Sequence, residues 1–336
     1  MDTLNKNIPA EPGTEEQDTA GREVFLRSQL KKAYGTATTS WLIYMVVLTV
    51  CSLVVMGLQN AGKADGLFFI IANLAAPLVA HICALLFGYN SLKAFSVKDP
   101  FNTPFRGKAW GFGLFAALGM QGAWIFIINI LTRITGHSGM PDSVAETISM
   151  GDDPVQNVII FIYVVLLGPV FEELVYRGFV LNALAPVNRW FAVICSALMF
   201  SLMHGNFAQI PNTFVVGIIF GYLAMKTGSI IPSVIAHIIM NFNATVTSLI
   251  YPEESYLYIH FAVTGVIGII CLVIYIMKNG KLTDEDIIVP SFKVDMPKTS
   301  ENTWKIYFTR PSFWITAVYF IYNAIVLYAM SGANVG

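Results

Sequence analysis

The chain consists mostly of long apolar segments that contain almost no charge. Hydrophobic residues make up 55% of its 336 residues and charged residues only 12%, whereas a soluble domain contains about 25% charged residues. A transmembrane helix needs roughly 20 consecutive apolar residues. The segments that approach or exceed this length are about 40–58, 67–92, 109–132, 155–178, 190–206, 209–226, 229–250, 258–277 and 312–330. The sequence therefore predicts an all-α fold, a polytopic membrane helical bundle.

Lys and Arg are distributed unevenly among the connecting segments. If the N-terminus is cytosolic, seventeen of the 20 Lys and Arg residues lie in segments on that side, and only Lys63 and Arg133 lie on the other. Cytoplasmic loops are enriched in these residues. The short segments 190–206 and 209–226 leave a count of about 8–9 transmembrane helices. We predict a multi-pass protein of the cell membrane with a cytosolic N-terminus and, for an odd count, an outer C-terminus.

The composition suggests four parts. They are a cytosolic polar tail (1–38), N-terminal transmembrane helices (39–150), a helical core (151–250), and C-terminal transmembrane helices (251–336) with a cytosolic connection at 278–311.

Two of the polar segments allow more specific expectations. Within the tail, residues 8–21 are acidic and contain Pro and Gly, so we expect them to be disordered. Residues 22–34 could form a short basic helix with Val24, Phe25, Leu30 and Tyr34 toward lipid, or a solvated start to the first span. The connection 278–311 is expected to be a tether rather than a docking segment.

Glu172 and Glu173 are the only two of the 21 acidic residues inside a predicted span. A charge at that depth costs about 3 kcal/mol to insert and by default indicates a functional site. Arg177 follows Glu173 by four residues on the same helix face, so it is the expected partner. A structural ion pair would account for these two residues but not for Glu172. Pro169 removes a backbone donor just before the pair and should loosen the helix there.

Two histidines lie in the spans that follow the glutamate pair. His204 shares a helix face with Phe200, and His237 shares one with Asn241, because each pair is four residues apart. A single histidine in a span is usually a hydrogen-bonded core residue, and we interpret His81 in this way. Two histidines, two glutamates and an asparagine on three nearby spans instead indicate a single site.

These residue types are suited to hydrolysis. A carboxylate and an imidazole beside a buried cavity can activate water, and a second histidine with an asparagine amide can donate to an oxyanion. The sequence contains no G-x-S-x-G, H-E-x-x-H or P-loop motif. Two histidines and a carboxylate are also a common catalytic zinc set, which makes Glu172, His204 and His237 candidate metal ligands. The spacing leaves open whether there is no cofactor or a divalent metal such as zinc.

Three motifs, in this order, resemble the CPBP family. They are E-E-x-x-x-R at Glu172–Arg177, F-x-x-x-H at Phe200–His204 and H-x-x-x-N at His237–Asn241. This is the family of type II CAAX prenyl endopeptidases and bacteriocin-processing proteins, also called the Abi family. The similar part extends from about 155 to 250, and residues outside it match nothing that we can name.

The resemblance implies an intramembrane endopeptidase, of glutamic or metal-dependent type, with its site open to the cytosolic leaflet. By position, Glu172 would activate water together with His204. Glu173 and Arg177 would support and orient that site, while His237 and Asn241 would stabilise the oxyanion. The substrate would be a peptide or a lipidated protein next to membrane lipids.

Two other functions remain open from the sequence. One is a non-proteolytic membrane scaffold, or a bacteriocin immunity or regulatory factor, that binds a partner in the same cavity. The other is a transporter that uses the glutamates as a proton relay, although no inverted repeat is visible. Glu172→Gln should abolish hydrolysis but leave a scaffold's partner bound. The net charge of −1 gives no reason to expect a nucleic acid partner.

Overall fold

The described part of the chain is helical and contains no strand. The computed structural model describes residues 14–63, 66–92, 110–135, 153–250, 254–280 and 303–333. The helices are α1 (Thr14–Asn60), α2 (Gly66–Leu92), α4 (Trp110–Thr135), α6 (Pro154–Ile162), η1 (Tyr163–Leu167), α7 (Gly168–Glu173), η2 (Leu174–Val180), α8 (Leu181–Leu184), α9 (Arg189–Leu202), α10 (Ile210–Thr227), α11 (Ile231–Ile250), α12 (Glu254–Asn279), α13 (Thr303–Phe308) and α14 (Pro311–Ala333). The prediction of an all-α membrane bundle is confirmed.

The predicted apolar segments all appear as helices, but they differ in length. Six helices of the described part are long and apolar enough to cross a membrane, and three shorter apolar helices accompany them. The α9 helix has 14 residues, which at 1.5 Å per residue is about 21 Å, less than the thickness of a hydrocarbon core of about 30 Å. Residues 203–209 connect α9 to α10, and the two helices pack against each other.

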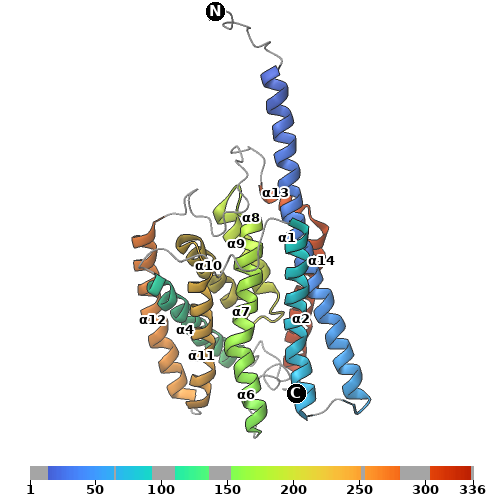
Figure 1. Cartoon of the computed structure of the whole chain (residues 1–336). Helices are drawn as coiled ribbons and strands as arrows, with labels where there is room; N and C mark the ends of the chain where they lie inside the picture. Colours follow the sequence, from blue (N-terminus) through green and yellow to red (C-terminus); the bar gives the residue numbers. More distant parts are fainter. Residues whose placement is uncertain are drawn as a thin grey trace, which may run out of the picture.

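The helices lie side by side in one bundle, beyond which the first half of α1 extends (Figure 1). The beginning of α1 and the end of α14 lie on opposite sides of the bundle. A chain that crosses the membrane an odd number of times has its two ends on opposite sides, as is the case here. Our assignment of the α1 side to the cytosol stays a prediction.

The N-terminal segment differs from the prediction. The α1 helix runs without interruption from Thr14 to Asn60, so residues 14–21 are helical rather than disordered, and residues 8–13 lie outside the described part. Leu30 is 2% exposed and Tyr34 is fully buried. These side chains therefore pack inside the protein and do not face lipid.

The prediction that the connection 278–311 is only a tether is also wrong for its last residues. Tyr307 of α13 is fully buried, and its ring centroid lies 5.5 Å from that of Phe191 and 5.0 Å from that of Phe313. The short α13 helix thus anchors the start of α14 on α9. Residues 281–302 of the predicted connection lie outside the described part of the chain.

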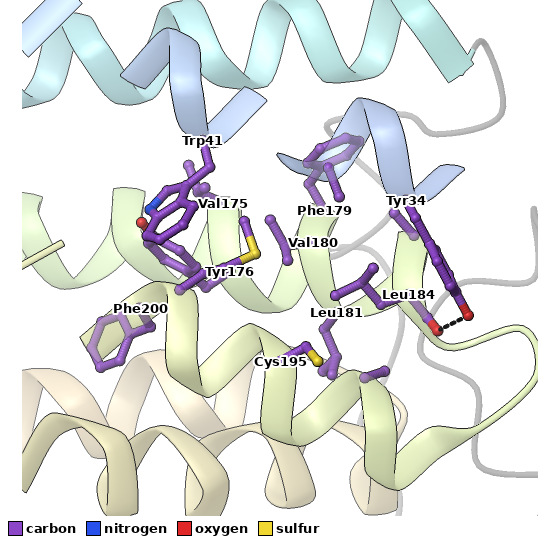
Figure 2. Close-up of a cluster of buried hydrophobic side chains, with 14 of the residues drawn as sticks. Tyr34, Trp41, Val175, Tyr176, Phe179, Val180, Leu181, Leu184, Cys195 and Phe200 are labelled. Atoms are coloured by element: carbon purple, nitrogen blue, oxygen red, sulfur yellow. Dashed lines mark hydrogen bonds between the residues drawn. The ribbon is translucent and has the colours of Figure 1, made fainter. Parts of the chain in front are cut away.

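A large apolar cluster fixes the segment that contains the glutamates. Figure 2 shows Trp41 and Tyr34 of α1 facing η2 and α8. Tyr176 and Phe179 of η2 are fully buried in this cluster, and the Tyr34 hydroxyl donates to the carbonyl of Leu184 at 3.5 Å. In a membrane the surrounding lipid is as apolar as the core, so close packing rather than removal from water joins the helices, and this cluster packs η2 and α8 against α1.

The segment from Pro154 to Leu184 is not a uniform α-helix. The Asp153 carboxylate caps its beginning by accepting from the backbone N–H of Val155 at 2.8 Å. Two π-helical stretches, η1 and η2, then flank α7. The expected loosening before the glutamates is present, because η1 immediately precedes α7, where Pro169 has no N–H to donate to the helix. π-helical insertions occur frequently at functional sites.

Candidate active site

The six residues predicted from the sequence come together around one cavity. Glu172 and Glu173 end α7, Arg177 lies in η2, and His237 and Asn241 lie in α11. A cavity of about 560 Å³ is lined by Glu172, His204, His237 and Asn241, together with apolar and uncharged polar side chains. Glu173 and Arg177 do not line it, and both are fully buried. The two adjacent glutamates therefore have different surroundings.

Glu173 and Arg177 form the buried ion pair expected from their spacing. The Arg177 Nη1 donates to Glu173 Oε1 at 2.8 Å, and its Nη2 donates to the carbonyl of Gly217 at 3.1 Å. A Cβ atom at Gly217 would lie 3.0 Å from the Ala197 Cβ and 3.3 Å from Arg177 Nη2. The α10 backbone thus contributes to the site, which the motifs did not predict. The missing side chain of Gly217 is what allows this close approach.

His237 connects the two glutamates. Its Nδ1 lies 3.0 Å from Glu173 Oε1, and its Nε2 lies 3.7 Å from Glu172 Oε2. The Glu173 carboxylate paired with Arg177 can only accept a hydrogen bond, so His237 Nδ1 donates. This bond fixes the ring so that Nε2 points toward Glu172 and the cavity. The second glutamate, which the ion pair alone left unexplained, thus has His237 as its neighbour.

Two aromatic rings, those of Phe200 and Phe220, lie against Arg177 and His237. The Arg177 guanidinium carbon lies 4.3 Å from the centroid of the Phe200 ring and 5.3 Å from that of Phe220. The same two rings contact His237, at centroid distances of 5.8 and 5.3 Å. Cation–π contacts of this kind stabilise a desolvated guanidinium by about 2 kcal/mol. Phe220 was missed in the sequence, where an apolar residue in a span gives no specific signal.

His204 lies just after the end of α9. Its Nδ1 lies 3.0 Å from the carbonyl of Phe200. Because a carbonyl oxygen can only accept, Nδ1 carries the hydrogen and a neutral His204 has its lone pair on Nε2. Gly205 follows with φ of +63°, and the amide of Asn206 holds the turn by donating to the His204 carbonyl at 3.0 Å. Thus Nε2 of His204 is the nitrogen available as an acceptor.

His204 also lines a second cavity. This cavity, of about 350 Å³, lies between the turn at 203–205 and helices α1 and α14, with Ser52 and Asn323 in its wall. His204 therefore stands between two cavities that different parts of the bundle form.

Asn241 connects α11 to the π-helical stretch η1. Its Nδ2 donates to the carbonyl of Val164 at 2.8 Å. In a π-helical stretch backbone carbonyls have altered intrahelical partners, and the Asn241 amide supplies a donor there. The amide has two N–H groups, so one donor is left after this bond.

The predicted metal ligands line the cavity, but they do not form a metal-binding group as they stand. In the described part of the chain, no three or more His, Cys, Asp or Glu side chains are arranged to hold a metal ion. The Glu173 carboxylate holds Nδ1 of His237, an arrangement that also orients histidines that bind metals through Nε2. The choice between no cofactor and a divalent metal therefore stays a prediction.

His81 does not make the hydrogen bond between helices that we expected. Its ring lies against that of Tyr44, with centroids 4.6 Å apart, and neither ring nitrogen has a hydrogen-bond partner among the described residues. Tyr44 and His81 belong to α1 and α2. An aromatic contact thus replaces the predicted hydrogen bond between these helices.

The fold and the site together define a class of protein, a polytopic helical membrane protein with a buried Glu–Arg–His–Glu cluster beside a cavity. Residues 154–243 match the family described as type II CAAX prenyl endopeptidase Rce1-like. This match covers only part of the chain, and it agrees with the resemblance of the three motifs to the CPBP family. All six predicted site residues lie within the matched segment.

Two relatives are similar over part of the chain. The membrane-embedded CAAX protease MroQ of Staphylococcus aureus (strain USA300) is 31% identical over 133 residues, which are 37% of this chain and 52% of the relative. The putative membrane peptidase YdiL of Bacillus subtilis (strain 168) is 29% identical over 93 residues, 27% of this chain and 38% of the relative. The chain thus spans about half or less of these relatives' length. No solved structure matches it.

Proposed function

We propose that this protein is an intramembrane endopeptidase that hydrolyses a peptide bond in a membrane-associated peptide or lipidated protein. The observation that supports it most is the contrast between the two glutamates. Glu173 is neutralised by Arg177 in the core, whereas the Glu172 side chain is 17% exposed and lines the cavity. A carboxylate with one face open to a cavity, and with its neighbours held in place, is suited to act as a general base.

Water activation would use Glu172 and His204. In this mechanism, the Glu172 carboxylate takes a proton from water as the water oxygen attacks the carbonyl carbon of the scissile bond. His204 Nε2 orients the water by accepting from its second O–H, which the hydrogen bond from Nδ1 to Phe200 favours. The proton held by Glu172 then passes to the leaving amine as the C–N bond breaks.

Charge develops on the carbonyl oxygen during this attack. His237 would donate to this oxygen from Nε2, on the cavity side, and Asn241 has one N–H group beyond its bond to Val164. Donors that are already fixed in position stabilise an oxyanion without reorganisation, and the loss of one such donor costs about 3 kcal/mol. Glu173 and Arg177 would contribute by fixing the His237 ring rather than by touching the substrate.

The site is large enough for a peptide segment. Its volume of about 560 Å³ falls in the range of ligand pockets, roughly 300–1,000 Å³. The relatives are described as a CAAX protease and a putative membrane peptidase, which agrees with a peptide substrate in a membrane setting. We propose the cell membrane as the location, with the N-terminus in the cytosol.

Hydrolysis by purified protein tests this proposal. The full chain in detergent micelles would be incubated with fluorogenic peptides, each with and without a C-terminal lipid, and compared with Glu172→Gln. We expect cleavage by the wild-type protein and a loss of at least about 100-fold in the variant, because a general base typically contributes that much. An unchanged midpoint of thermal unfolding would show that the variant is folded. Equal cleavage by both proteins would refute the assignment of Glu172.

A further inference from the structure

The cavity of the candidate active site extends from Glu172 toward one end of the bundle only. On the segment that contains the glutamates, the lining residues lie between Ile160 and Glu172. On α11 they begin at His237 and continue toward the C-terminal end of that helix. His237 lies beside Glu172 and Asn241 binds the Val164 carbonyl, so the two stretches run antiparallel. From Glu172 to Ile160 the cavity follows the chain for about 18 Å, at 1.5 Å per residue.

Helices α9 and α10 show the same limit. The last turn of α9 contributes Phe200, and the first two turns of α10 contribute lining residues as far as Val216. Among the described residues, none of α9 before Phe200 and none of α10 after Val216 lines the cavity. We call the layer of Glu172, Phe200, Val216 and His237 the floor of the cavity.

The bundle is closely packed on the other side of the floor. Residues 174–185, which follow the glutamates, are all buried. In α10, residues 217–225 are buried except Ile218, and in α11 residues 232–234 are buried. This packing closes the site on that side. A substrate must therefore reach the floor from the half of the bundle in which α6 begins and α11 ends.

Three helix ends meet beyond the floor. Trp190 at the start of α9 stacks on Tyr222 near the end of α10, with ring centroids 5.6 Å apart. The Tyr222 hydroxyl donates to the carbonyl of Gly280, just after α12. The Phe191 ring lies 5.4 Å from that of Tyr34 in α1. The first part of α1 extends past this same end of the bundle (Figure 1), and we predict that end to be cytosolic.

The distribution of basic residues on the helices of the site agrees with this orientation. Arg189 begins α9, Lys226 lies in the last turn of α10, and Lys278 lies in the last turn of α12. At the opposite end, the sequence segments 136–153 and 251–253 contain no Lys or Arg. Because these residues are enriched on the cytoplasmic side, the floor separates the cavity from the cytosol.

On these grounds we infer that the site receives its substrate from the outer side of the membrane. This inference rests on the proposed function and names its substrate class, a peptide segment at the outer face. It differs from the cytosolic opening that the resemblance to the CPBP family implies. A protein lipidated in the cytosol would meet the packed end of the bundle, whereas an exported peptide would meet the cavity.

The accessibility of single cysteines tests the side on which the cavity opens. Ala244→Cys and Thr213→Cys place a thiol in the cavity wall on two different helices. Lys63→Cys and Lys278→Cys are controls at exposed positions at the two ends of the bundle. Each full-length variant would be made with the four native cysteines replaced by Ala, namely Cys51, Cys83, Cys195 and Cys271. A membrane-impermeant maleimide would be added to intact cells and, separately, to lysed cells.

We expect both cavity thiols to react in intact cells to the same extent as Lys63→Cys, and Lys278→Cys to react only after lysis. Reaction of both cavity thiols only after lysis would overturn the inference. Reaction of Lys278→Cys instead of Lys63→Cys in intact cells would also overturn it, because the orientation would be reversed. Cavity thiols that stay unreactive even in lysed cells would do the same, since the cavity would then be closed to water.

A second measurement separates this inference from the proposed function. Random decapeptides, which do not cross the membrane, would be given to intact cells and to inverted membrane vesicles, each with wild-type protein or Glu172→Gln at matched levels. We expect new peptide termini only with the wild-type protein in intact cells. Cleavage by the wild-type protein in inverted vesicles alone would overturn the inference and leave the proposed function standing. Thiol labelling from outside without wild-type-dependent cleavage on either side would refute the proposed function and leave the outward opening standing.

Discussion

Glu173 and His237, which are 64 residues apart in the chain, are joined by a contact of 3.0 Å between Glu173 Oε1 and His237 Nδ1. The same carboxylate oxygen accepts from Arg177 Nη1 at 2.8 Å. One buried atom therefore links the helix that contains the glutamates to α11, where both His237 and Asn241 lie. The ion pair and the imidazole form one unit, and a change in any member should alter the other two.

The first prediction concerns the stability of this unit. Arg177→Met leaves the Glu173 carboxylate buried, fully inaccessible to solvent and without its counter-ion. Breaking a buried pair by removing one partner costs about 3–5 kcal/mol. We expect the free energy of unfolding in detergent to fall by this amount.

The double variant Glu173→Gln/Arg177→Met is the matched control, because it removes both charges. It should recover most of the lost stability, since a buried pair contributes little beyond an uncharged replacement. It should not recover hydrolysis, because His237 loses the carboxylate that orients it. A double variant that is no more stable than Arg177→Met would contradict this account of the pair.

A second prediction concerns Asn241. Replacement by Ala removes the bond of 2.8 Å to the Val164 carbonyl and the remaining N–H that faces the cavity. If that N–H donates to the oxyanion, kcat should fall about 100-fold, with KM nearly unchanged, because an interaction made in the transition state is lost. Steady-state kinetics with the cleaved peptide would measure both quantities. An increase in KM alone would assign Asn241 to substrate binding instead.

The third prediction concerns metals. His237 Nε2 and Nδ1 face two carboxylates, and we propose that water is activated directly by Glu172 and His204. Activity should therefore survive prolonged dialysis against a strong chelator. Loss of activity that returns when zinc is added would contradict direct activation and would identify the two histidines and Glu172 as metal ligands.

The fourth prediction concerns how α4 is positioned beside the site. A Cβ atom at Gly119 of α4 would lie 2.0 Å from the Gly268 Cα of α12, so the two helices meet backbone to backbone. Gly119→Val should separate them and lower the midpoint of thermal unfolding, and peptide cleavage should fall because α4 lines the cavity through Gln121. Gly57→Ala is the control, because nothing lies within 4 Å of a Cβ at that exposed position of α1. Equal midpoints for both variants would contradict the close contact.

The site could be predicted from the sequence to the extent that spacing determines it. The spacing of four positions from Glu173 to Arg177 is enough to predict their pairing, which the structure shows. The bridge made by His237 could not be predicted, because it depends on the packing of α11 against α7. The place of Gln121 in the cavity wall could not be predicted either, because the residue belongs to no motif.

Part of the error in the fold has a physical cause. In a membrane protein, lipid-facing and core-facing residues are both apolar, so hydropathy cannot distinguish them. One of the two interpretations of residues 22–34 placed Leu30 and Tyr34 toward lipid, but both are buried in the core. Tyr307, in a segment that was expected to be a tether, is buried as well. Only a packed structure shows which apolar side a helix presents to its neighbours.

The central claim is that Glu172 activates water for peptide hydrolysis, and one comparison in cells tests it most directly. Cells producing the wild-type chain and cells producing Glu172→Gln, at matched membrane levels, would be compared by mapping peptide termini in the membrane and secreted fractions. The account predicts new termini only with the wild-type chain, which would also reveal the substrate. Identical maps, with a phenotype that survives the substitution, would contradict the account and indicate a scaffold that binds without cleaving.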